Sequence, residues 1–144
     1  MKWVLLSIFL FFLMFQFLQI DKKNPPFQEK DDFIIAEKIP EPLALSLQKA
    51  CYDCHSYETQ YPWYTYIVPL SYWIRNHINE GRSHLNFSLW AKYSKEEQKE
   101  LREEIWEEII KNKMPLKTYI FMHKDAHLNP KEKKSLEIFL KEIM

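Results

Sequence analysis

The chain begins with an almost wholly apolar stretch. Between Trp3 and Ile20 no side chain is charged, and only three are polar, namely Ser7, Gln16 and Gln19. A run of this length is close to what a helix needs to cross the hydrocarbon layer of a membrane. The stretch also lacks a small-x-small cleavage pattern at its end. The sequence therefore favours an uncleaved N-terminal membrane anchor over residues 1–20, with a removed export signal as the alternative.

The polar segment that follows separates this stretch from a region with helical periodicity. Residues 21–38 carry two prolines and no apolar repeat, so we expect a tether. Residues 39–144 have the length of one domain. Within them, the first helix has Pro42 in its first turn and carries the cysteine pair at its end. The second begins near Pro69 and is expected to end at Gly81, in a left-handed conformation.

Two further helices are predicted by their capping residues. Ser94 and Glu97 have the spacing of a capping box, and the helix that they start should end before Pro115. A last helix follows, with Asn129 as its N-cap and Pro130 in its first turn. No alternating strand pattern is present. The sequence thus predicts an all-α domain of about four helices.

Composition narrows the functional classes. The 20 basic and 20 acidic side chains balance, and the lysines are interleaved with glutamates. This distribution argues against a nucleic-acid partner. Aromatic side chains make up 16% of the chain. They suit either the surroundings of a large flat apolar ligand or an ordinary aromatic core, and composition does not separate the two.

The motif CYDCH holds the only two cysteines, Cys51 and Cys54, followed directly by His55. A structural zinc site needs four ligands, usually in two separated pairs, and no second cysteine pair is present. A thioredoxin-like redox pair belongs in a fold with strands. A disulfide would close a very small loop and would leave His55 unexplained. The C-x-x-C-H pattern is the known signature of covalent haem attachment, which we favour over the other three interpretations.

Three segments carry a resemblance to a known family. ACYDCHSYETQYPWY, HINEGRSHLNFSLW and KMPLKTYIFMHKDAHL, in this order, resemble the small bacterial haem-binding domain family of c-type cytochromes. The resemblance implies a largely helical domain with one haem c, and thus one iron, per chain. It also implies that Cys51 and Cys54 are the attachment thiols and His55 the proximal iron ligand. It does not name an electron partner.

The sixth iron ligand is expected to be Met114. This residue lies between two predicted helices and is fixed by the following proline, and a thioether opposite a histidine is a common haem ligation. His123 is the strongest rival, because it follows the methionine loop closely. Met122 is a weaker alternative.

The haem propionates require cationic or hydrogen-bonding partners. Arg75 and Arg82 flank the second helix and are the candidates, although either is as easily a solvated surface charge. Trp63 and Tyr64 follow the attachment motif closely and are expected to form a wall of the haem pocket.

With both axial positions filled, the iron would have no open site for a substrate. The sequence therefore predicts an electron carrier rather than an enzyme, with an unidentified redox protein as partner. Haem attachment of this type takes place outside the bacterial cytoplasm, so the domain should face the periplasm, held at the cytoplasmic membrane by the anchor. The alternatives are a haem-based sensor or enzyme with a displaceable sixth ligand, and a haem-free interaction domain with a Cys51–Cys54 disulfide.

Overall fold

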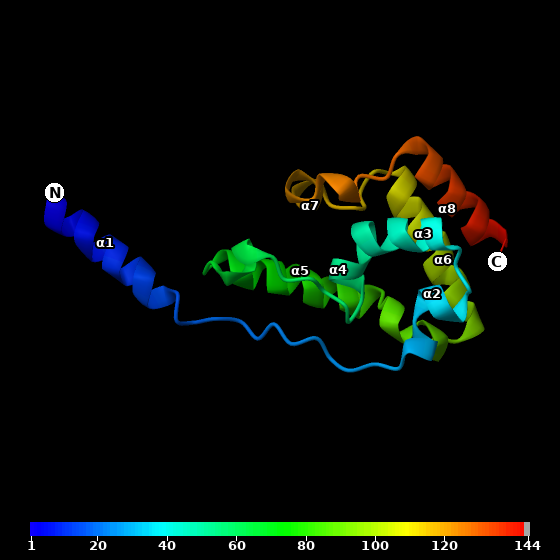
Figure 1. The fold of residues 1–144 in the computed structure, drawn as a ribbon, viewed down its shortest axis with the longest axis horizontal. Helices are drawn as coiled ribbons and strands as arrows, with labels where there is room; N and C mark the ends of the chain where they lie inside the picture. Colours follow the sequence, from blue (N-terminus) through cyan, green and yellow to red (C-terminus); the bar gives the residue numbers. More distant parts are fainter. Residues whose placement is uncertain (143–144) are drawn as a thin grey trace.

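The computed structural model describes residues 1–142, which contain helices and no strand (Figure 1). The predicted all-helical fold class is confirmed for these residues. The α-helices are α1 (Lys2–Phe15), α2 (Phe33–Ala36), α3 (Glu41–Leu47), α4 (Asp53–His55), α5 (Leu70–His84), α6 (Lys95–Ile110), α7 (Lys117–Met122) and α8 (Pro130–Glu142). A π-helical turn, Gln48–Tyr52, joins α3 to α4, and 3₁₀ turns cover Glu29–Asp31, Trp63–Tyr66, Phe87–Lys92 and Lys124–Ala126.

The N-terminal helix is shorter than the sequence predicts. Helix α1 has 14 residues and ends at Phe15. Among residues 1–142 no helix has both the length and the apolar character that crossing a membrane requires, so the predicted spanning helix is not supported. The next residue after α1, Gln16, forms two hydrogen bonds with the backbone of Val68. Its side-chain nitrogen donates to the Val68 carbonyl at 3.1 Å, and its side-chain oxygen accepts from the Val68 amide at 3.0 Å.

The packed structure starts inside the segment that was expected to be a tether. Phe33, on α2, is fully buried, and Asp32 caps that helix by accepting a hydrogen bond from the Ile34 amide at 2.9 Å. Part of the expected tether is therefore packed on the domain. Periodicity missed α2 because a helix of four residues is too short to show a repeat.

The core is a stack of aromatic rings. Phe87 stacks on Phe33 at 5.1 Å and on Tyr52 at 5.2 Å between ring centroids, and Trp90 lies 4.3 Å from Phe33. All four are buried. Tyr52 lies within the cysteine motif, so this stack joins the motif to the α2 segment and to the turn after α5. Part of the aromatic content thus serves an ordinary core.

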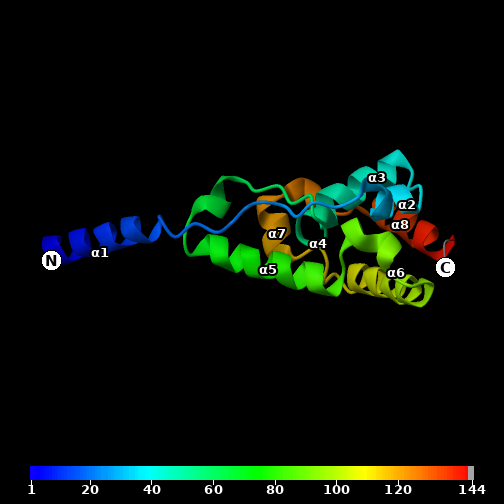
Figure 2. The same ribbon diagram turned by 90° about the horizontal axis from the view of Figure 1, so that it is seen from below.

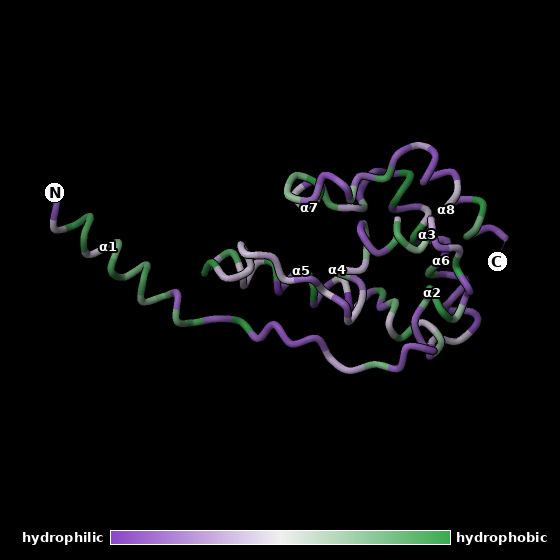
Figure 3. Tube along the Cα trace, viewed as in Figure 1, coloured by the Kyte–Doolittle hydropathy of each residue, from purple (hydrophilic) through white to green (hydrophobic). Residues whose placement is uncertain are grey.

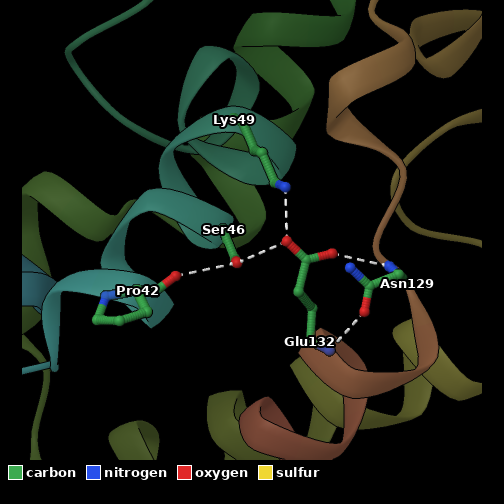
Figure 4. Close-up of polar contacts among 5 residues, drawn as sticks. All are labelled: Pro42, Ser46, Lys49, Asn129 and Glu132. Carbon is green, nitrogen blue, oxygen red and sulfur yellow. Dashed lines mark hydrogen bonds and ion pairs between the residues drawn. The ribbon is translucent and has the colours of Figure 1, made fainter.

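Helix α8 is held to α3 through one carboxylate (Figure 4). Asn129 and Glu132 cap α8 reciprocally: the Asn129 side chain accepts from the Glu132 amide at 3.0 Å, and the Glu132 carboxylate accepts from the Asn129 amide at 2.8 Å. The same carboxylate accepts from Ser46 at 3.0 Å and from Lys49 at 2.6 Å. The predicted cap of this helix is confirmed, and so is the capping box of Ser94 and Glu97 on α6.

Gly81 has a different role from the predicted one. Helix α5 continues past it to His84, and the φ angle of Gly81 is not positive. Helix α4 packs on α5 here (Figure 2), and a Cβ at position 81 would lie 2.7 Å from the Cys54 carbonyl oxygen. The glycine is required by this close backbone approach rather than by a helix end.

Gly81→Ala should therefore destabilise the fold even though alanine is the better helix former. The gain in helix propensity is about 1 kcal/mol, whereas forcing a methyl group against packed backbone costs about 1–3 kcal/mol. We expect a net loss in the free energy of unfolding, measured by urea denaturation. Asn79→Ala, at an exposed position of the same helix, is the control and should leave stability unchanged or raised. Equal stabilisation by both changes would contradict the close approach.

Candidate functional site

The cysteine motif lies on a cavity between α4, α5 and α6. Cys51 belongs to the π-helical turn, while Cys54 and His55 belong to α4. The cavity has a volume of about 590 Å³ and is lined by all three residues and by Met114. This volume lies in the range of small-molecule and cofactor sites. The structure thus brings the four predicted metal-site and attachment residues to one place.

The ring of His55 is oriented by a backbone carbonyl. Its Nδ1 donates to the Leu85 carbonyl, which lies 3.2 Å away at the end of α5. This bond leaves Nε2 as the nitrogen available to a metal, an arrangement typical of metal-binding histidines. Burial lowers the pKa of the imidazole from its ordinary value. The neutral form that a metal requires is therefore the stable one at neutral pH.

Both cysteine sulfurs are free thiols. Burial, reinforced by the neighbouring Cys54, raises the pKa of Cys51 to about 12. Burial together with the Asp53 charge raises the pKa of Cys54 to about 11. In the folded chain both groups are thus protonated at neutral pH and are poor nucleophiles.

The two residues between the cysteines fix the motif on opposite sides. The Tyr52 hydroxyl donates to the buried Asp32 carboxylate at 2.8 Å. Asp53 accepts from the Gln60 amide at 2.8 Å and from the Tyr119 hydroxyl at 2.7 Å. Sequence reasoning treated these two positions as arbitrary and did not identify Tyr119, which the cavity also contacts. The only signal was that both positions carry side chains able to form hydrogen bonds.

Met114 and its rival His123 occupy different places. Met114 lies in the loop between α6 and α7, where its amide donates to the Glu108 carbonyl at 3.1 Å, and it lies on the cavity wall. His123 is not among the lining residues. Its ring stacks on Tyr119 with 4.3 Å between centroids, and its Nε2 is hydrogen-bonded to the Tyr64 hydroxyl. The structure therefore places Met114, and not His123, on the cavity that the motif lines.

Neither predicted arginine lines the cavity. Arg82 donates to the Ser56 carbonyl at 2.7 Å, to the Thr59 hydroxyl at 2.9 Å and to the Asn24 side chain at 3.0 Å. Arg75 bonds the Asp21 carbonyl. Arg82 thus holds the N-terminal segment and the loop after the motif on α5, and Arg75 holds the N-terminal segment. Their role toward haem propionates stays a prediction. Besides His55, the basic side chains on the cavity wall are those of His77 and His84.

Trp63 and Tyr64 line a second cavity, which adjoins the first. Its volume is about 310 Å³. The two cavities share four residues: Cys54, His77, Leu116 and Tyr119. Trp63 and Tyr64 are thus wall residues beside the motif rather than on the motif cavity itself.

The lining of the motif cavity fits a haem. Two thiols, an imidazole with a free Nε2 and a thioether all line it. Aliphatic and aromatic side chains complete the lining, among them Phe87, Leu101 and Ile105. A flat apolar macrocycle with a central iron requires this combination of an apolar lining with nitrogen and sulfur donors.

Comparison with known proteins agrees with this site. The sequence model of a family described as a haem-binding domain matches residues 10–142, which is nearly the whole chain. No curated protein and no solved structure matches the chain.

The bond between Tyr52 and Asp32 should contribute measurably to stability. Burial raises the pKa of Asp32 from its ordinary value, and the Tyr52 hydrogen bond opposes this effect. Tyr52→Phe leaves the buried carboxylate without that donor, and we expect a loss of about 1–3 kcal/mol in the free energy of unfolding. Tyr57→Phe is the matched control, because within residues 1–142 the Tyr57 hydroxyl forms no hydrogen bond. Denaturant titration of both variants checks this; equal losses would contradict it.

Proposed function

This chain belongs to the haem-binding domain family, and from that premise we propose that it carries one covalently attached haem c and transfers electrons. The observation that supports the proposal most directly is the convergence of Cys51, Cys54, His55 and Met114 on one cavity. The haem supplies one-electron chemistry when bound, and the residues of the chain hold it, orient it and tune it.

Attachment would proceed by addition. Each thiol forms one carbon–sulfur bond to a vinyl group, and its proton is transferred to the other vinyl carbon, so no atom is lost and no oxidant is required. The two sulfurs lie on the turn and helix at the cavity edge.

Two iron ligands supplied by the chain would favour electron transfer over catalysis. His55 offers Nε2, held in place by the Leu85 carbonyl, and Met114 offers its sulfur from the loop after α6. With both in place, the iron has no free position for a substrate or gas. The protein would then set the reduction potential through its axial ligands, burial and hydrogen bonds.

The location and the partner are part of the proposal. Covalent haem attachment to a C-x-x-C-H motif takes place outside the bacterial cytoplasm, so we propose that the domain works there. Its partner would be another redox protein.

The attachment can be tested on protein matured in a host that attaches haem. Because addition loses no atom, the mass of the chain should rise by the full mass of one haem. The haem should stay with the chain after acid extraction. Cys54→Ala should still retain the haem through the Cys51 thioether bond, whereas Cys51→Ala combined with Cys54→Ala should release it, since no thioether bond is left. A colourless chain with a mass two hydrogens below that of the dithiol would establish the disulfide alternative and refute the proposal.

The sixth ligand can be tested by removing its sulfur. Met114→Ala should abolish the sulfur-to-iron charge-transfer band of the oxidised protein. It should also lower the reduction potential, because a thioether ligand raises it. His123→Ala is the control and should retain the band, since His123 lies off the cavity wall. The reduced wild-type protein should not bind carbon monoxide, whereas the Met114 variant should. Carbon monoxide binding by the wild type would favour the sensor or enzyme alternative.

A further inference from the structure

Large apolar side chains are exposed mainly at one end of the folded domain. This aromatic end consists of Trp63, Tyr66, Leu70, Trp73, Phe121 and Met122. Trp63 is 70% exposed and Phe121 79% exposed. Four of the six line the smaller cavity together, which places the start of α5 beside α7. Over the rest of the domain the exposed large apolar residues are isolated ones on separate elements, such as Leu45, Ile110 and Ile138.

The aromatic end is continuous with the apolar N-terminal segment. The Gln19 side chain donates to the Tyr66 carbonyl at 3.0 Å, and Gln16 forms the two bonds to the Val68 backbone that end α1. Helix α1 extends away from this point as an exposed apolar rod (Figure 3). One apolar surface therefore runs from α1 onto the first turns of α5 and onto α7.

The chemistry of this surface distinguishes a lipid bilayer from a protein partner. Residues 61–74 contain no charged side chain, so this part of the surface has no charge with which to orient a protein partner. Tryptophan and tyrosine are the residues that gather at the boundary between lipid tails and headgroups. Cations lie next to them: the Lys22 ammonium lies 4.0 Å from the centre of the Tyr66 ring, and Arg75 bonds the neighbouring Asp21 carbonyl.

We propose that the aromatic end rests on a lipid bilayer surface, with Trp63, Trp73 and Phe121 at the headgroup boundary and the N-terminal segment in contact with the same surface. Such binding requires a continuous apolar face rather than a helix that crosses the bilayer. The smaller cavity would then open beside the lipid, with the motif cavity behind it.

The proposal predicts which tryptophans meet lipid. The full chain has five, at positions 3, 63, 73, 90 and 106. Protein containing fluorotryptophan, matured with its haem, would be mixed with phosphatidylcholine bicelles. Fluorine spectra would be compared with and without lipid that carries a doxyl spin label near the glycerol. Single Trp→Phe variants assign the signals. The comparison with unlabelled bicelles removes any broadening that the haem iron causes.

We expect the spin label to broaden the Trp63 and Trp73 signals at least fivefold more than those of Trp90 and Trp106. Trp90 is fully buried and Trp106 half-buried, so these two are internal controls. Broadening of Trp3 alone would show that only the N-terminal segment meets lipid and would overturn the proposal. Equal broadening of all five signals, or of none, would also overturn it.

A dilution series without lipid tests the alternative that a second copy of the chain covers the aromatic end. If the Trp63 and Trp73 signals shift with protein concentration and do not respond to spin-labelled bicelles, the aromatic end is an interface between two copies of the chain, and the proposal is wrong. This test is independent of the iron ligands, so its failure would leave the proposed electron transfer untouched.

Discussion

The close approach of α4 to α5 is the constraint on which the site depends. The backbone at Cys54 lies so near to Gly81 that no side chain fits between them. One turn further along α5, the Leu85 carbonyl receives the Nδ1 proton of His55. If the two helices were further apart by the width of a methyl group, the imidazole would lose this acceptor, and its Nε2 would no longer be directed by the backbone. The chain has one glycine, and it lies where the backbone packing and the orientation of the His55 ring depend on each other.

The motif is rigid because its two intervening residues are fixed in different directions. Tyr52 points into the aromatic core and bonds Asp32, whereas Asp53 points toward the loop and α7 and bonds Tyr119. Removing either contact frees one side of the turn and helix that carry the two sulfurs. The cysteines and the histidine supply the chemistry, and the two residues between the cysteines hold them in position.

Features set by local chemistry could be predicted from the sequence. The Ser94 capping box and the Asn129 cap involve residues three apart, and the sequence displays both. The glycine was misassigned because a helix end and a close backbone contact both require glycine, and only the fold distinguishes them. The contacts of Arg82 could not be predicted, because its acceptors, among them Asn24, lie far away in sequence. The chemistry of the site could be predicted from the cysteine motif, because the residue types of the motif already determine that chemistry.

The charges around the motif cavity oppose the effect of the proposed methionine ligand. Glu80, Glu104 and Glu108 line the cavity, and no lysine or arginine does. In the proposed holoprotein, carboxylates near the iron would favour the oxidised state, which carries one more positive charge. The reason is that each carboxylate would repel the electron that reduction adds. Glu108 is partly neutralised by Lys113 at 3.0 Å, while Glu104 has no ion-pair partner among residues 1–142. A thioether ligand raises the potential, so the working potential would reflect the balance between the Met114 sulfur and these carboxylates.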